Sequence, residues 1–314
     1  MVRKGCAGSS PAPGTPLRHR PISTTMVQTH TGKGPATRLA PTPSGFLHAG
    51  NAISFLLTHF LASRIGATMV LRIDDLDQER TRPAFVEDIF EGLHWLGIDW
   101  QRGPTCASDH FLNFSQSLRL ARYNAVVEDL IRHQAVFACT CTRPQTRPMG
   151  TGSICIRGCE ANELEGVRLS ASLRLRVPPA CMVRIPTWRG EDRVVDLHAA
   201  MGEPVIRQRP GPSVLGRPSY QIASLADDID MGITHIVRGV DLLPSTACQL
   251  HIAGMLGMGG FLGIRFVHHE LILDPQGGKL SKSAGSASLK AVRERNEGPE
   301  ALFLEAERLS ASVL

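Results

Sequence analysis

The alternation of strand-like and helix-like segments in the first half of the chain most narrows the fold that it can adopt. Residues 68–73 form a β-rich run in which residues 69–71 are apolar throughout, as in strands that are buried on both faces of a parallel sheet. Apolar residues recur at helical spacing in 53–61, 85–96 and 117–131, and residues 37–40 precede the first of these helices as a short strand. Strands that alternate with such helices predict βαβ units, and hence an α/β fold with a doubly wound parallel sheet.

The chain changes character after residue 138. Short strand-like runs at residues 173–177, 182–185 and 193–197 are separated by proline or glycine. Strands that are short and closely spaced do not continue a βαβ pattern. We therefore expect residues 138–205 to be an α+β insertion that interrupts the α/β domain.

The α/β pattern returns at Tyr220. It passes through a strand at residues 234–237, enters a helix that we expect to be capped near Ser245 or Thr246, and reaches a last strand at 271–273. The predicted organisation, taken along the chain, is a basic disordered extension at residues 1–36, a first half of the α/β domain at 37–137, the insertion at 138–205, a second half at 206–285 and a short C-terminal helical segment at 286–314.

The net charge of the chain lies in its N-terminal extension. The chain has 34 Lys and Arg against 29 Asp and Glu, and residues 1–37 hold five basic residues and no acidic one. The rest is therefore neutral, and its net charge gives no argument for nucleic-acid binding. The composition of the extension predicts disorder, with an organelle-targeting segment or a natural start at Met26 as alternatives. No apolar run is long enough to span a membrane and no secretion signal is visible, so we expect a cytoplasmic protein.

A loop rich in proline and glycine, residues 41–51, joins the first strand to its helix. Gly50 allows a close approach of the backbone to a ligand. His48 and Asn51 would lie at the helix N-terminus, where free N–H groups and the helix dipole favour phosphate. We predict that His48, Gly50 and Asn51 bind the phosphates or the ribose of a nucleotide. The alternative is a simple turn in which a histidine caps the helix.

A second candidate loop follows Gly277 and Gly278 and carries Lys279, Ser281 and Lys282. Two ammonium groups near a hydroxyl can close over a triphosphate and stabilise the charge that develops on departing pyrophosphate. We predict a nucleotide-binding role for this loop. A solvated charged loop is the alternative for the segment taken alone.

Four of the eight cysteines are clustered. Cys139-x-Cys141 is followed, after thirteen residues, by Cys155-x3-Cys159. In a chain without a secretion signal such a cluster favours a metal over disulfides, and four thiolates suit tetrahedral zinc. We predict one structural zinc ion per chain, because four protein ligands leave no open position for chemistry. Core or oxidised cysteines are the alternative.

Taken together, these segments resemble class I aminoacyl-tRNA synthetases, in particular the catalytic region of glutamyl-tRNA synthetases and their short paralogues, the glutamyl-queuosine tRNA(Asp) synthetases. The resemblance extends over residues 37–285. It is carried by six motifs, which read TRLAPTPSG, HAGN, LRIDD, YQIA, IVRGVDL and KLSKS in chain order. It implies a Rossmann-type sheet with a zinc-containing insertion, a catalytic role for His48, Asn51, Lys279, Ser281 and Lys282, and ATP binding by His48, Gly50, Asn51 and Lys282.

The resemblance also implies a glutamate pocket. Arg38 and Arg238 would meet carboxylates, Asp74 would meet the ammonium group, and Tyr220 would add a hydrogen bond. A guanidinium group matches a carboxylate at two points, and a buried one without its anion is costly, so Arg238 favours glutamate over glutamine. A structural salt bridge is the alternative for each of these residues. The backbone that would line the pocket is that of Arg38, Leu39, Ala40, Pro41 and Thr42.

Two positions depart from the family pattern. Glutamate enzymes usually have Glu where this chain has Asp74, although glutaminyl relatives use Asp there. The paralogues often have Tyr where this chain has Cys155, so this would be an all-cysteine zinc site. Residues 284–314 also leave no room for the long helical anticodon-binding region of a full glutamyl-tRNA synthetase.

The expected activity is therefore the ATP-dependent conversion of L-glutamate to glutamyl-adenylate, followed by transfer of the glutamyl group to queuosine in the anticodon of tRNA(Asp). ATP would bind with Mg²⁺, and we expect a monomer that does not associate with membranes. One alternative is a truncated glutamyl-tRNA synthetase or a ligase that loads another acceptor. A non-enzymatic tRNA-binding module is the other, and the intact His48, Lys279 and Lys282 count against it.

Overall fold

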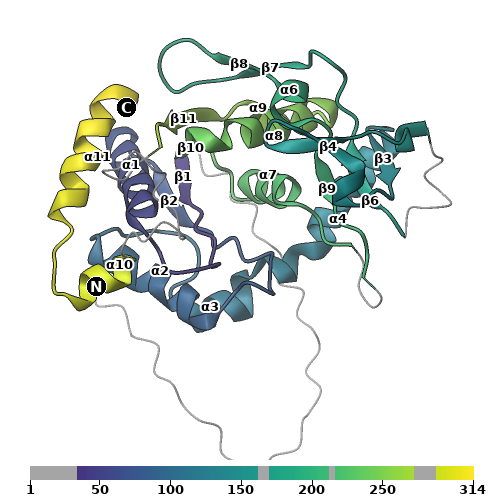
Figure 1. The fold of residues 1–314 in the computed structure, drawn as a ribbon. Coiled ribbons are helices and arrows are strands. Elements are labelled where there is room, and N and C mark those ends of the chain that lie inside the picture. The colour runs from purple at the N-terminus through teal and green to yellow at the C-terminus, as the bar shows by residue number, and fades with distance from the viewer. Residues whose placement is uncertain (1–33, 162–169, 212–215, 272–287) are drawn as a thin grey trace, which may run out of the picture.

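The computed structural model describes residues 34–161, 170–211, 216–271 and 288–314 (Figure 1). Most of the predicted N-terminal extension lies outside this part of the chain. The predicted lysine loop, with Lys279, Ser281 and Lys282, also lies outside the described residues.

Two pairs of parallel strands form the centre of the molecule, β1 (Ala36–Leu39) with β2 (Thr68–Leu71) and β10 (His235–Gly239) with β11 (Arg265–His269). The pairs lie side by side, because the N–H of Thr234, just before β10, donates to the carbonyl of Ala36 in β1 at 2.9 Å (Figure 1). The strands therefore follow the order β2, β1, β10, β11. The chain winds outwards from β1 and β10 in both directions, as the sequence predicted for a doubly wound α/β fold.

Both faces of these strands are buried, each in its own hydrophobic core. In β2, Val70 belongs to one core, whereas Met69 and Leu71 belong to the other. Ile236 and Val237 in β10 divide between the two cores in the same way. Because neighbouring side chains of a strand point to opposite faces, burial of both faces explains the apolar run Met69, Val70 and Leu71 in β2.

Helices supply the remaining side chains of the two cores. The helices are α1 (Ala49–Ile65), α2 (Pro83–Trp95) and α11 (Glu300–Val313) in one core, and α4 (Leu120–Arg132), α7 (Tyr220–Asp230) and α8 (Leu243–Met255) in the other. α11 lies along α1, where the rings of Phe60 and Phe303 have centroids 6.3 Å apart. The C-terminal helix α11 therefore packs against α1, the helix that follows the proline- and glycine-rich loop (Figure 1).

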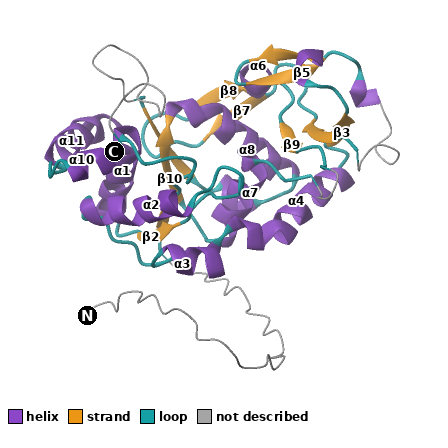
Figure 2. Ribbon diagram, turned by 60° about the horizontal axis from the view of Figure 1, so that its bottom comes forward, coloured by secondary structure: helices purple, strands orange, loops and turns teal. Residues whose placement is uncertain are grey.

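Between α4 and α7 the chain forms antiparallel strands, of which β3, β5 and β9 lie at the end of the molecule opposite α11, while the β7–β8 hairpin lies nearer the centre (Figure 2). One sheet has the order β3 (Val136–Cys139), β6 (Ser172–Leu175) and β9 (Val205–Arg207). Two hairpins accompany it, β4 (Thr146–Met149) with β5 (Gly152–Cys155) and β7 (Met182–Ile185) with β8 (Arg193–Asp196). The shorter helices are α3 (Ala107–Asp109), α6 (Leu197–Met201), α9 (Gly259–Leu262) and α10 (Leu289–Glu294). The boundaries that we predicted for an insertion stay a prediction.

The start of one predicted helix was wrong, and one strand was missed. The helix expected to be capped near Ser245 or Thr246 begins at Leu243, with a proline in its first turn. The hydroxyl of Thr246 donates to the carbonyl of Leu242 at 3.0 Å, four residues back, so it lies inside the helix rather than capping it. The missed strand is β11, which follows this helix. Of the strand predicted at residues 271–273, Leu271 lies outside any strand and the other two residues lie outside the described part of the chain.

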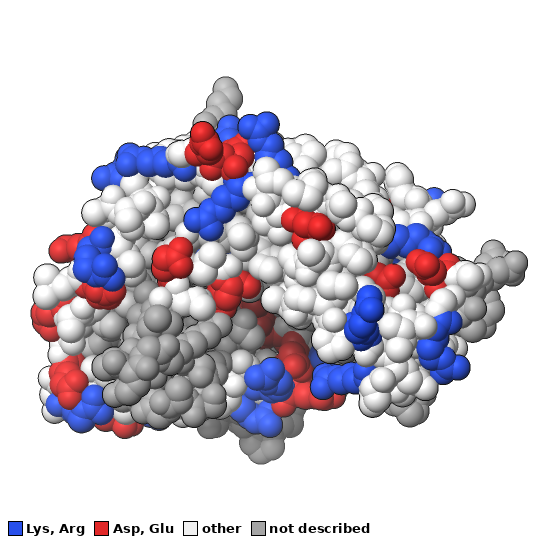
Figure 3. All heavy atoms as spheres, turned by 45° about the horizontal axis from the view of Figure 1, so that its top comes forward, with Lys and Arg blue, Asp and Glu red and all other residues white. Residues whose placement is uncertain are grey.

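The described surface carries both signs of charge. In the view of Figure 3, the basic and acidic side chains of the described residues are interspersed, and no continuous basic face is visible there. Among the described helices, none is both long enough and apolar enough to cross a membrane.

Candidate active site

The loop rich in proline and glycine ends at His48, the residue that precedes the first turn of α1. The side-chain oxygen of Asn51 accepts a hydrogen bond from the His48 N–H at 3.1 Å, which fixes the loop to the helix. A Cβ atom on Gly50 would lie 3.1 Å from Cε1 and 3.2 Å from Nδ1 of the His48 ring. Gly50 therefore makes room for the imidazole of His48 in this structure, a role that the sequence did not reveal.

The C-terminal segment, from residue 288 onwards, holds the proline- and glycine-rich loop in place. The N–H of Leu47 donates to Oδ2 of Asp88 in α2 at 2.8 Å, and Arg293 in α10 donates to Oδ1 of the same carboxylate at 2.7 Å. The N–H of Leu289 also donates to the Leu47 carbonyl at 2.8 Å. The C-terminal segment thus helps to position His48.

A cavity of about 150 Å³ lies between β1, α1 and β10. It brings together residues that are far apart in the sequence, since β1 and β10 are adjacent strands. Its lining includes predicted site residues from both halves of the chain, namely Arg38, Leu39, Ala40, Asn51, Tyr220 and Arg238. The other lining residues are Ser54, Phe55, Thr58, Val237, Gly239 and Leu242.

A second cavity, of about 230 Å³, is lined by Thr42, Asp74 and Tyr220 among others. Tyr220 borders both cavities, so they are neighbours. Pro41 lines neither cavity, but its carbonyl accepts from the N–H of Asp74 at 2.8 Å and holds the two strand ends together.

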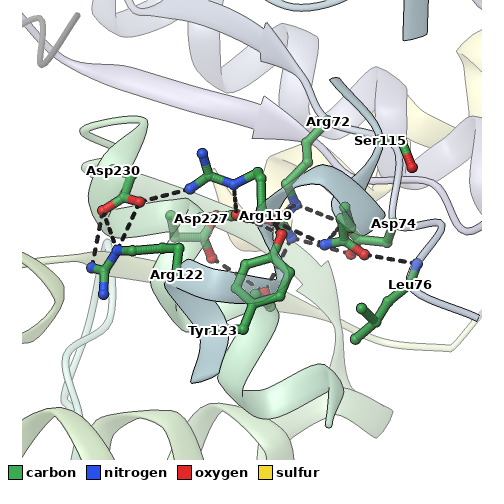
Figure 4. Close-up of polar contacts among 12 residues, drawn as sticks. Arg72, Asp74, Leu76, Ser115, Arg119, Arg122, Tyr123, Asp227 and Asp230 are labelled. Carbon is green, nitrogen blue, oxygen red and sulfur yellow. Dashed lines mark hydrogen bonds and ion pairs between the residues drawn. The ribbon is translucent and has the colours of Figure 1, made fainter. Parts of the chain in front are cut away.

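Buried arginines and aspartates form an ion-pair network beside these cavities (Figure 4). Arg72 donates to both oxygens of Asp74, at 2.6 Å from Nε and 3.1 Å from Nη2. Oδ1 of Asp228 accepts from Arg72 Nη1 at 2.7 Å and from Arg38 Nε at 3.2 Å. Asp74 therefore lines the second cavity with its carboxylate already bound to Arg72.

The two carboxyl groups bound to Arg72 differ in pKa. Burial, the largest influence on both, favours the neutral acid. In Asp228 the guanidinium groups of Arg72, Arg38 and Arg238 outweigh burial, and its pKa lies below the usual value. In Asp74 burial prevails over Arg72, and its pKa is raised. Asp228 is thus the firmly ionised anion at this site.

The network continues outwards to α4 (Figure 4). Asp227 accepts from Tyr123 Oη at 2.9 Å and from Arg119 Nε at 2.7 Å. Arg119 and Arg122 both pair with Asp230. Asp75 lies outside this set of ion pairs, since its carboxylate is held by His110, Ser115 and Gln116. Arg72, Asp227 and Asp228 were not singled out from the sequence, although two adjacent acids among the apolar residues of this helix were a usable signal.

Arg238 makes two hydrogen bonds, as Arg38 does, whereas Arg72 makes four. Its Nη1 donates to Gln249 Oε1 at 3.0 Å and to Thr246 Oγ1 at 3.3 Å. Among the described residues, its Nε and Nη2 have no hydrogen-bond partner, although both atoms are buried. Burial lowers the pKa of Arg238, and although Tyr220 and Asp228 raise it, the nearby Arg38 and Arg72 lower it further. The group is therefore suited to receive an anion.

A serine and a histidine near the first cavity were also missed from the sequence. Nδ1 of His269 lies 2.8 Å from the carbonyl oxygen of Glu270, which can only accept, so Nδ1 carries the proton. Nε2 then accepts from the hydroxyl of Ser54 at 2.6 Å. This pair fixes the Ser54 hydroxyl at the cavity wall.

The four clustered cysteines converge from β3, β5 and the turns that follow them. The sulfur atoms of Cys139, Cys141, Cys155 and Cys159 all lie within 4.8 Å of one another. None of the four is in a disulfide. Four thiolates around a zinc ion at about 2.3 Å would lie about 3.8 Å apart, so the arrangement fits a tetrahedral site.

The sequence profile described as tRNA synthetases class I (E and Q), catalytic domain, matches residues 36–153 and 192–313. The chain belongs to this family. The match confirms the family expected from the motifs, which is a family of ligases. It omits residues 154–191, where Cys155, Cys159 and the strands β6 and β7 lie.

Similar proteins of known name extend the comparison. A glutamate–tRNA ligase from Synechococcus sp. (strain JA-3-3Ab) is 33% identical over 84% of this chain and 54% of that protein. The chain thus spans about half the length of this relative. A glutamyl-Q tRNA(Asp) synthetase from Nitratidesulfovibrio vulgaris is 32% identical over 82% of this chain and 80% of that protein. A crystal structure of a glutamate tRNA ligase from Elizabethkingia meningosepticum superposes with a TM-score of 0.63 over 80% of this chain and 52% of that one, at 24% identity, and supports the fold.

Proposed function

We propose that this protein activates L-glutamate with ATP to glutamyl-adenylate and transfers the glutamyl group to queuosine in the anticodon of tRNA(Asp). The observation that carries the amino-acid choice is that Nε and Nη2 of Arg238, at the cavity, are buried without a hydrogen-bond partner among the described residues. A side-chain carboxylate would accept from both groups, whereas the carboxamide of glutamine offers one neutral acceptor.

The charges of the site support an anionic substrate. Five arginines and four aspartates are joined by the ion pairs of the network, which leaves one positive charge among them. Glutamate carries one net negative charge and glutamine carries none. In this proposal Arg38 and Arg238 bind the substrate carboxylates, and Asp74 and Tyr220 bind its ammonium end, with the backbone of residues 38–42 as the pocket wall.

The chemistry of activation needs positioning rather than a side-chain nucleophile. An oxygen of the substrate α-carboxylate attacks the α-phosphorus of ATP, the bond to the β-phosphate oxygen breaks, and pyrophosphate leaves. His48 and Asn51 would hold the phosphates at the start of α1, with Lys279, Ser281 and Lys282 stabilising the charge on the departing group. Gly50 contributes by leaving space for the His48 ring.

Two metals belong to the proposal. Mg²⁺ would enter with the triphosphate of ATP and neutralise part of its charge. Zinc would be held by Cys139, Cys141, Cys155 and Cys159, where it would stabilise the fold around β3 and β5. The N–H of Cys155 is fixed by Oε2 of Glu203 at 2.7 Å, so the ligand-bearing strand is oriented by the chain itself.

The choice of acceptor is supported by one relative. The glutamyl-Q tRNA(Asp) synthetase from Nitratidesulfovibrio vulgaris is 32% identical over 82% of this chain. Charging of tRNA(Glu) is the alternative, because relatives of both kinds are equally similar in sequence identity. Glutamylation of tRNA(Glu) in preference to tRNA(Asp) would favour that alternative.

ATP–pyrophosphate exchange without tRNA tests the activation half of the proposal. We expect glutamate to support exchange better than glutamine or aspartate. Arg238→Ala should raise the KM for glutamate and erode discrimination against glutamine, at a cost of about 2–5 kcal/mol for a lost buried charge contact. Asp74→Asn should weaken the binding of glutamate and of glutamine to a similar extent, because both amino acids carry the ammonium group that Asp74 would contact. Better activation of glutamine or aspartate by the wild type would contradict the pocket assignment.

A further inference from the structure

The guanidinium group of Arg238 is held on one side by neutral partners. Nη1 donates to Gln249 Oε1 at 3.0 Å and to Thr246 Oγ1 at 3.3 Å. The Thr246 hydroxyl gives its own proton to the carbonyl of Leu242, so its oxygen accepts both from Arg238 and from Nε2 of His268 at 2.9 Å. His268 stays neutral, because burial and the nearby Arg238 lower its pKa to about 3.

Arg238 has no carboxylate of its own among the described residues. The nearest anion is Asp228, whose Oδ2 lies 4.0 Å from Nη2. That carboxylate already accepts from Arg38 at 3.2 Å and from Arg72 at 2.7 Å. Since Arg238 is only 4% exposed, water cannot replace the missing anion at low cost.

Gln249 decides whether this charge is compensated. It lies on α8, is fully buried, and presents its amide oxygen to Arg238. A glutamate at this position would have the same reach and would supply a carboxylate. A neutral glutamine instead leaves the charge of Arg238 available, and it occupies Nη1 so that Nε and Nη2 remain for a ligand.

We propose that Gln249 is a positioning residue that sets the charge specificity of the cavity, by holding Arg238 with a neutral acceptor so that the pocket selects an amino acid with an anionic side chain. This inference rests on the proposed function, in which the cavity binds glutamate. Gln249 acts through Arg238 and does not line the cavity itself.

The variant Gln249→Glu tests the role of charge with little change of shape. We expect its KM for glutamate in pyrophosphate exchange to rise by at least about tenfold, while the KM for glutamine stays the same or falls. Tenfold corresponds to about 1.4 kcal/mol of substrate binding. Without substrate, the variant should melt at or above the wild-type temperature, because a buried guanidinium gains an anion. The rise in melting temperature on adding glutamate should shrink.

Gln249→Met is the matched control, because methionine has a similar length and no charge. We expect this variant to raise the KM for glutamate and the KM for glutamine together. The ratio of the two KM values should stay within about threefold of the wild-type ratio, well short of the tenfold change expected for Gln249→Glu. The inference would be overturned by any of three results: an unchanged ratio of the two KM values in Gln249→Glu, an equal change of that ratio in both variants, or a Gln249→Glu protein that fails to fold. Failure of the wild type to activate glutamate would refute the proposed function instead, and the melting temperature of substrate-free Gln249→Glu would still test the charge argument.

Discussion

Asp228→Asn should destabilise the protein strongly, because one carboxylate serves two buried arginines. Asp228 is fully buried, with Oδ1 2.7 Å from Arg72 Nη1 and 3.2 Å from Arg38 Nε. Asparagine keeps the shape but removes the charge, which leaves both guanidinium groups undercompensated. Breaking a buried pair by removing one partner costs about 3–5 kcal/mol, and a carboxylate with two partners should lie in the upper part of that range. Urea unfolding at pH 7, followed by tryptophan fluorescence, measures the loss.

Asp74→Asn is the matched comparison, because Asp74 is also buried and also bound to Arg72. The pKa of Asp74 is raised in the folded protein, so its ionised form lowers stability once the pH rises through that value. Neutral asparagine removes this cost along with the ion pair, and we expect Asp74→Asn to lose much less stability than Asp228→Asn at pH 7. The reasoning would be refuted by an Asp228→Asn loss below about 1 kcal/mol, or by equal losses in the two variants.

The pH dependence of Asp228→Asn follows from the sign of the shift. The folded-state pKa of Asp228 lies below the unfolded value of 3.8, so its stabilisation is present above pH 3.8 and is lost as the pH falls through the folded value. The difference in unfolding free energy between wild type and Asp228→Asn should therefore be constant near neutrality and narrow below about pH 4. A difference that grows in acid would contradict this assignment.

Three further predictions concern the nucleotide loops and the cysteine cluster. Lys282→Ala should abolish pyrophosphate exchange with the fold intact, a loss of about 2.7–4 kcal/mol in transition-state stabilisation, and near-normal exchange would remove this residue from the mechanism. Gly50→Ala should lower exchange while leaving the melting temperature nearly unchanged, because a Cβ 3.1 Å from the His48 ring displaces the imidazole; full activity would show that the ring adapts. Elemental analysis should find about one zinc per chain, and the double substitution Cys139→Ser and Cys159→Ser should remove it and unfold the surrounding strands first; zinc retained by that variant would exclude this ligand set.

The periodicity of the sequence predicted the α/β core well. Residues 69–71 are apolar throughout, and the structure buries them in two separate cores, as expected for a strand covered on both faces. The elements around the proline-rich loop and the helices at 83–95 and 120–132 also follow from apolar spacing. The start of α8 was misjudged because Ser245 and Thr246 resemble capping residues, whereas a short turn of helix already precedes them.

The charged interior could not be predicted from local pattern. Arg72 and Asp228 are far apart in the sequence, and their 2.7 Å contact exists only because β2 and α7 pack together. The motif resemblance selected Arg38, Asp74 and Arg238, which we expect to contact the substrate. It did not select the residues that link these three side chains to one another. Gln249 gave no signal either, because its importance depends on Arg238 having no carboxylate within hydrogen-bonding distance among the described residues, the nearest being that of Asp228 at 4.0 Å.

The most direct test of the proposed function is the glutamylation of tRNA(Asp) with and without queuosine. Purified full-length protein, ATP, Mg²⁺ and labelled L-glutamate would be incubated with both forms of tRNA(Asp) and with tRNA(Glu). We predict that label enters only the queuosine-containing tRNA(Asp). Labelling of tRNA(Glu), or equal labelling of tRNA(Asp) with and without queuosine, would contradict the proposal.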